Sequence, residues 1–142
     1  MFVIMERDVQ AEADSVNLRV PFHAPAASVV RSELRGWLQE KGFGGETVDD
    51  ARVVVSELVG NSVRHAVPLP VNDLIVSWAV DNGDLVISVS DGGSQSTIPH
   101  PVVAAQSAIS GRGLSIVDAL VERWWVEDDR GRTTVHVRIP LD

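Results

Sequence analysis

Four side chains that can bind metals or anions recur at helical spacing between residues 57 and 65. Glu57, Asn61, Arg64 and His65 stand at i, i+4, i+7 and i+8, and at about 100° per residue they share one helix face. A carboxylate, a carboxamide and two potential cations could hold a metal ion and an anion. The alternative is the solvated polar face of an amphipathic helix. Asn61 and Gly60 favour the binding hypothesis, because both residue types lower helix propensity in mid-helix.

A second candidate is the carboxylate of Asp91. It follows a run in which the apolar residues of 85–89 alternate with others, and it has the same parity as those apolar residues. The side chain should therefore point to the buried face, where a carboxylate must find hydrogen-bond donors. Either it lies at the floor of a pocket and accepts a hydrogen bond from a ligand amine, or it begins a turn with Gly92 and Gly93.

A third candidate is the run Gly111-Arg112-Gly113-Leu114 at the expected start of a helix. Two glycines permit a close approach of the backbone, and a helix N-terminus favours phosphate. Arg112 could add positive charge. The alternative is a glycine-rich loop that only leads into a helix. The run matches neither the Walker A pattern nor the complete dinucleotide fingerprint.

The elements that must position these residues follow from hydrophobic periodicity and turn residues. Residues 1–14 are expected to be a loosely held or edge segment, and 91–112, rich in Ser, Pro and Gly, a functional lid or a disordered loop. Thr47 is the expected N-cap of the second helix. The pattern predicts strands over 16–20, 74–80, 85–90, 124–126 and 135–139. It predicts helices between Pro25 and Gly42, over 47–66 and over 114–121. Antiparallel hairpins with separate helices indicate an α+β two-layer sandwich.

Composition narrows the function classes. The 142 residues suit one domain, and 12 basic against 20 acidic residues give a net charge of −8. So acidic a chain is a poor candidate for binding nucleic acid or an anionic membrane. There is no cysteine, which excludes thiolate chemistry and Cys-ligated metals. No apolar run approaches a membrane span, and the N-terminus lacks the features of a signal peptide. We therefore expect a cytoplasmic protein.

Together, in this order, the three candidates resemble the GHKL ATPase superfamily, which includes gyrase, Hsp90 chaperones, histidine kinases and MutL proteins. The stretches 57–66 and 111–117 resemble more narrowly the anti-sigma-factor serine kinases. The resemblance runs from about residue 16 to the end and includes 131–135. It implies the Bergerat ATP-binding fold over residues 1–142, with a mixed, mostly antiparallel sheet and helices on one face. An ATP lid would span 94–110.

The resemblance also implies roles for the acid and amide of the helix. Glu57 would polarise or deprotonate the attacking nucleophile, and Asn61 would bind the Mg²⁺ that bridges the ATP phosphates. Arg64 and His65 would lie near the phosphates.

Adenine recognition is implied for Asp91, which would accept the amino group. Gly93 would let the backbone approach the base, and Thr133 would bond adenine through water. The run Gly111-Arg112-Gly113-Leu114 would hold phosphates. One departure concerns Gln95, which stands where the family's second motif often has its last glycine, so the anchoring of the lid is expected to differ.

The implied function is a serine/threonine protein kinase that phosphorylates a STAS-type anti-anti-sigma partner and sequesters a sigma factor. Dimer formation is common among such proteins. The alternative is an ATP-responsive switch that binds partners with little or no phosphotransfer. A histidine kinase catalytic domain is a weaker option, because no helical hairpin that could carry a phosphoacceptor precedes the domain.

Overall fold

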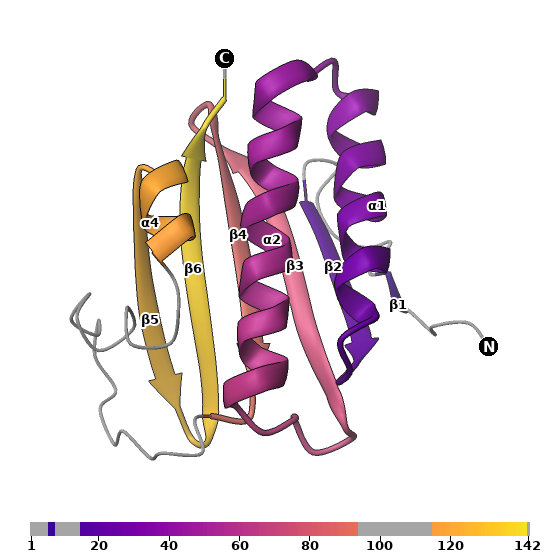
Figure 1. The fold of residues 1–142 in the computed structure, drawn as a ribbon, viewed down its shortest axis with the longest axis vertical. Coiled ribbons are helices and arrows are strands. Elements are labelled where there is room, and N and C mark those ends of the chain that lie inside the picture. The colour runs from indigo at the N-terminus through magenta and orange to yellow at the C-terminus, as the bar shows by residue number, and fades with distance from the viewer. Residues whose placement is uncertain (1–5, 8–14, 94–114, 142) are drawn as a thin grey trace.

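The computed structural model describes residues 6–7, 15–93 and 115–141. Six strands form one sheet in the order β1-β2-β3-β4-β6-β5, and α1, α2 and α4 lie on one of its faces (Figure 1). The elements are β1 (Glu6–Arg7), β2 (Ser15–Pro21), α1 (Ala26–Glu40), α2 (Gly45–His65), β3 (Asp73–Asp81), β4 (Asp84–Asp91), α4 (Ser115–Leu120), β5 (Arg123–Asp129) and β6 (Arg132–Pro140). The α+β two-layer prediction is confirmed.

All strand pairings in the described part of the chain are antiparallel. The expectation of a mixed sheet was wrong in that respect. Strands β3 and β4, and strands β5 and β6, form tight hairpins. The helices α1 and α2 join β2 to β3 and return the chain to the end of the sheet where β2 finished, so that Pro21 pairs with Asp73. Residues 6–7 pair with β2 as an edge strand, as expected, and the remaining residues of 1–14 lie outside the described residues.

The core lies between the helices and the inner face of the sheet. In β4 the inward residues Leu85, Ile87 and Val89 are fully buried, because side chains alternate between the two faces of a strand. From the helix layer, Leu34 of α1 and Leu58 of α2 pack into the same cluster. Burial of these apolar surfaces is the main contribution to stability.

Two hairpin turns have the backbone that tight antiparallel turns need. Asn82 and Gly83 have φ of 51° and 80°, and Arg130 and Gly131 have φ of 54° and 80°, as two-residue hairpin loops favour. Arg138 binds the first turn, donating from Nη2 to Asp81 Oδ2 at 2.6 Å and from Nη1 to Asp84 Oδ2 at 2.9 Å. These two carboxylates raise the pKa of Arg138.

Two predicted helix boundaries differ from the structure. Helix α2 begins at Gly45, and the N-cap is Gly44 without a side-chain cap, so the assignment of Thr47 as N-cap was wrong. The glycines at 44 and 45 allow the chain to enter the helix two residues earlier, with φ of 60° at Gly45. Helix α4 ends at Leu120 rather than at residue 121.

The described helices include none that is both long and apolar enough to cross a membrane.

The alternation in β4 gives a direct test of the core. Ile87→Ala removes a fully buried side chain and should lower the free energy of unfolding by about 3 kcal/mol. Val86→Ala, on the opposite face, should cost about 1 kcal/mol or less. Urea unfolding followed by circular dichroism measures both. Equal losses would contradict the assignment of the two faces.

Candidate functional site

The end of α2 and the end of β4 are joined through the backbone. After the helix, the N–H of Val67 donates to the carbonyl of Gly93 at 2.9 Å, and the N–H of Gly92 donates to the carbonyl of Val67 at 2.7 Å. These two bonds hold the loop after β4 against the residues that follow the helix. The candidate residues of α2 and of 91–93 are therefore fixed relative to one another.

Asp91 lies on the inner face at the end of β4, as predicted, and it is 2% exposed. Ser62 of α2 donates from Oγ to Asp91 Oδ2 at 2.5 Å, and the backbone N–H of Gly93 donates to Asp91 Oδ1 at 2.9 Å. Thr133 is the partner of Asp91 in the register of β4 and β6, and it too is buried. A buried carboxylate is retained because donors from two elements compensate its desolvation.

The two glycines after Asp91 serve different purposes. A Cβ on Gly92 would lie 2.2 Å from the carbonyl oxygen of Pro68, so only glycine fits beside the residues that follow α2. Gly93 has φ of 106°, which L-residues with a Cβ rarely adopt. A Cβ there would lie 3.6 Å from Oγ1 of Thr133. The backbone of Gly93 therefore runs close to the Asp91–Thr133 pair.

Asn61 precedes Ser62 on α2 and is 3% exposed. Within the described part of the chain its Oδ1 is buried and has no hydrogen-bond partner. Leaving a buried amide oxygen unpaired costs about 1–3 kcal/mol, which favours a ligand at this atom. An oxygen without a protein donor suits Mg²⁺, which prefers oxygen ligands and takes few of them from the protein.

Glu57 lies one turn before Asn61 and is half-buried. It lines an open groove of about 400 Å³ on the outer surface of α1 and α2, together with Arg31, Asp49, Arg52, Val53 and Ser56. Arg31 Nη1 donates to Ser56 Oγ at 3.1 Å, and Arg52 Nε has no partner within the described residues. The open groove thus brings together two carboxylates and two arginine side chains.

Not all of the other predicted site residues lie beside Asp91 and Asn61. Arg64 and His65 are exposed on the last turn of α2. The guanidinium of Arg64 lies over Gly60, where a Cβ would be 3.0 Å from Nη1, so it occupies the space beside this glycine. The run Gly111-Arg112-Gly113-Leu114, Gln95 and the predicted lid over 94–110 lie outside the described residues.

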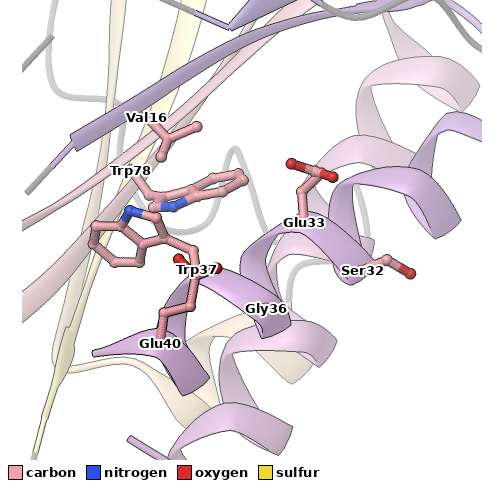
Figure 2. A pocket seen from close by; sticks show the side chains of 7 residues that line it. All are labelled: Val16, Ser32, Glu33, Gly36, Trp37, Glu40 and Trp78. Carbon is pink, nitrogen blue, oxygen red and sulfur yellow. The ribbon is translucent and has the colours of Figure 1, made fainter. Parts of the chain in front are cut away.

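A second pocket, of about 180 Å³, lies between α1 and strands β2 and β3 (Figure 2). Its lining residues are Val16, Ser32, Glu33, Gly36, Trp37, Glu40 and Trp78. The rings of Trp37 and Trp78 meet edge to face, with 6.3 Å between their centroids. The predicted site residues do not line this pocket, and the two buried tryptophans serve packing.

Sequence reasoning missed two residues that hold the site together. Ser62 is not among the residues that the sequence singles out, and the sequence gives Gly92 only a place in a turn. The available signal for Ser62 was a hydroxyl within an otherwise apolar helix face. For Gly92 the sequence held no signal, because the requirement comes from the Pro68 carbonyl.

A sequence profile of the histidine kinase-like ATPase domain matches residues 20–139. The chain therefore belongs to this family, as its motifs indicated.

Among named relatives, the serine-protein kinase RsbW of Listeria monocytogenes is 28% identical over 133 residues, which cover 86% of this chain and 85% of the relative. RsbW of Bacillus thuringiensis is 20% identical over 132 residues, or 86% of this chain and 82% of that one. These relatives confirm the resemblance to the anti-sigma branch.

The fold is also similar to a crystal structure of the RsbU and RsbW domains of a Mycobacterium tuberculosis protein. The TM-score is 0.71 at 26% identity, over 92% of this chain. The match spans 33% of that longer chain.

The contact between Gly92 and Pro68 predicts a specific loss of stability. Gly92→Ala should lower the free energy of unfolding by about 2 kcal/mol or more, because the new methyl group overlaps a carbonyl oxygen. Gly36→Ala is the matched control: no atom lies within 4 Å of its Cβ position in α1, and alanine should raise stability by about 1 kcal/mol. Thermal unfolding of the two variants beside wild type measures the difference. A neutral Gly92→Ala would show that the 67–68 and 92–93 segments are not held together.

Proposed function

We propose that this chain is an ATP-dependent serine/threonine protein kinase of the anti-sigma type, which phosphorylates a STAS-type anti-anti-sigma protein and sequesters a sigma factor. Membership in the ATPase family and the similarity to serine-protein kinases support the proposal. The observation that carries it is the buried carboxylate of Asp91, held by Ser62 and Gly93. A fixed, desolvated acceptor of this kind distinguishes an adenine amino group from a carbonyl.

In this proposal Asp91 accepts a hydrogen bond from the adenine amino group. Ser62 and the N–H of Gly93 keep the carboxylate in place before the nucleotide binds, so little conformational entropy is lost. Thr133, across the β4–β6 pairing, bonds the base through a water. The φ of Gly93 brings the backbone close to the same ring.

Mg²⁺ and the ATP phosphates belong next to Asn61. Its unpartnered Oδ1 is the atom we assign to the metal, and when bound the Mg²⁺ would neutralise phosphate charge. Arg64 and His65, at the end of the same helix, are proposed to lie on the phosphate side. The run Gly111-Arg112-Gly113-Leu114 is proposed to hold phosphates through its backbone N–H groups.

Glu57 is proposed as the base that orients the acceptor hydroxyl and takes its proton. A protein substrate must reach this carboxylate from outside, and Glu57 lines the groove between α1 and α2. Arg31 and Arg52 flank the same groove and can orient an incoming segment. Phosphoryl transfer requires mainly positioning and charge stabilisation, and these residues supply the positioning.

Charge supports the proposed partners. At a net charge of −8, the chain suits a basic surface on a sigma factor, because complementary charge speeds association. The cytoplasm is the proposed location, and a homodimer the proposed assembly.

The second candidate is an ATP-responsive partner switch without phosphotransfer. Gln95, in place of the family's usual glycine, favours it, since an altered lid could respond to the nucleotide without completing a transfer site. In that case ATP acts only through its different affinity for two conformations.

The adenine assignment predicts that Asp91→Asn weakens Mg-ATP binding by about 100-fold or more. The NH2 group of the new asparagine would face the adenine amino group, and two hydrogen-bond donors cannot pair. Titration calorimetry on the purified protein measures this, with Asp73→Asn, a buried carboxylate bonded to Arg19 at 2.6 Å, as the matched control. Retained affinity in a folded Asp91→Asn protein would remove the assignment.

The role of Glu57 separates the two candidates. With γ-labelled ATP and a STAS-type protein, Glu57→Gln should reduce label transfer by about 100-fold or more while Mg-ATP affinity stays the same. Asp49→Asn, which alters another carboxylate of the same groove, should leave transfer unchanged. If wild type transfers no label but binds a partner in an ATP-dependent way, the switch is the correct function.

A further inference from the structure

The face of the sheet opposite the helices carries a row of polar side chains. In β4, Ser88 and Ser90 alternate with the inward core residues, and the described helices all lie on the other side of the sheet (Figure 1). Ser88 pairs in register with His136 of β6, and His136 pairs with Trp125 of β5. Three adjacent strands therefore present a serine, a histidine and an aromatic ring side by side.

Hydrogen bonds connect this row into a relay. Ser88 Oγ lies 2.7 Å from His136 Nδ1, and His136 Nε2 lies 2.5 Å from Glu127 Oε1. An ionised carboxylate only accepts, so Glu127 places the ring proton on Nε2. In the neutral ring Nδ1 then carries the lone pair, and it accepts the hydroxyl proton of Ser88. The order is that of a nucleophile, a base and an orienting carboxylate.

An aromatic ring also packs on the face of the His136 imidazole. Trp125 stacks on His136 with 5.0 Å between ring centroids and 17° between planes, and the guanidinium of Arg123 lies over Trp125 at 4.6 Å. The side chain of His136 is 18% exposed and that of Glu127 is 65% exposed. The base is thus fixed in one orientation and remains within reach of a dissolved reagent.

We propose that Ser88 is a covalent modification site that accepts an acyl group from activated carboxylic esters. The oxygen of Ser88 attacks the ester carbonyl, and an Oγ–C bond forms while the hydroxyl proton moves to His136 Nδ1. The bond between the carbonyl carbon and the leaving oxygen then breaks, and the proton passes from Nδ1 to that oxygen. The products are acyl-Ser88 and the free alcohol, and no other reactant is needed.

The surrounding sheet limits this chemistry to a single acylation. Strand β4 lies between β3 and β6, so its backbone N–H groups are used in the two ladders. A repeating acyl transferase needs free N–H donors for the oxyanion, and a central strand does not offer them. We therefore expect one acyl group per chain and slow release, not turnover.

The test uses the intact protein and p-nitrophenyl acetate. We expect about one equivalent of p-nitrophenol per chain, with the acetyl group mapped to Ser88 by peptide mass spectrometry. Ser88→Ala should abolish this label, and His136→Gln should slow it by about 100-fold. Glu127→Gln should give an intermediate rate, because only the orientation of the ring is weakened.

Ser90→Ala is the matched control. Ser90 lies on the same strand and face but bonds to Thr134 Oγ1 at 2.8 Å, so its replacement should leave the labelling of Ser88 unchanged. Acetylation of Ser77 and Ser90 at rates similar to Ser88 would overturn the proposal. So would a Ser88 rate that is the same in a folded His136→Gln protein.

Discussion

The contact between Ser62 and Asp91 is the constraint on which the candidate site depends. A carboxylate that is 2% exposed is tolerated only with donors, and here one comes from α2 and another from the backbone of Gly93. The same bond ties the last turns of a helix to the end of a central strand. Asn61, next to Ser62, and Glu57, one turn earlier, are placed by that junction rather than by their own contacts. The residues proposed for adenine recognition and for metal binding are therefore parts of one rigid unit.

Much of this arrangement was readable from periodicity. The alternation in β4 predicts that Asp91 lies on the inner face, as the structure shows. The features that the sequence did not predict depend on tertiary contacts. Ser62 was not among the predicted site residues, since its partner is 29 residues away. The need for glycine at 92 arises from the Pro68 carbonyl, which no local pattern encodes. Thr47 has the right chemistry for a cap, but the positive φ of Gly45 lets the helix begin earlier. The roles of 111–114 stay predictions.

The same two-residue alternation gives the sheet two faces with different chemistry. Asp91 and Thr133 point toward the helices and are buried, whereas Ser88 and His136 point away from them. On the inner face the carboxylate of Asp91 has donors from Ser62 and Gly93, because apolar neighbours make an unpaired charged group costly. On the outer face Glu127 is 65% exposed, so water competes for its hydrogen bond to His136. A relay such as Ser88–His136–Glu127 persists there because aromatic stacking by Trp125 shields the ring and limits its rotamers.

The residues proposed for adenine recognition and for phosphoryl transfer contribute unequally to the stability of the fold. Replacing Asp91 by an apolar residue would remove the acceptor of Ser62 and of the N–H of Gly93, so stability itself favours the residue proposed to recognise adenine. Glu57 is half-buried at the edge of a groove, and its replacement leaves no buried group unpaired. Replacing Glu57, the residue proposed for phosphotransfer, should therefore change the stability of the fold little. Replacing Asp91, the residue proposed for nucleotide binding, should lower it. It follows that similarity in fold and in the Asp91 motif argues strongly for ATP binding, and that the kinase activity must be established at Glu57 itself.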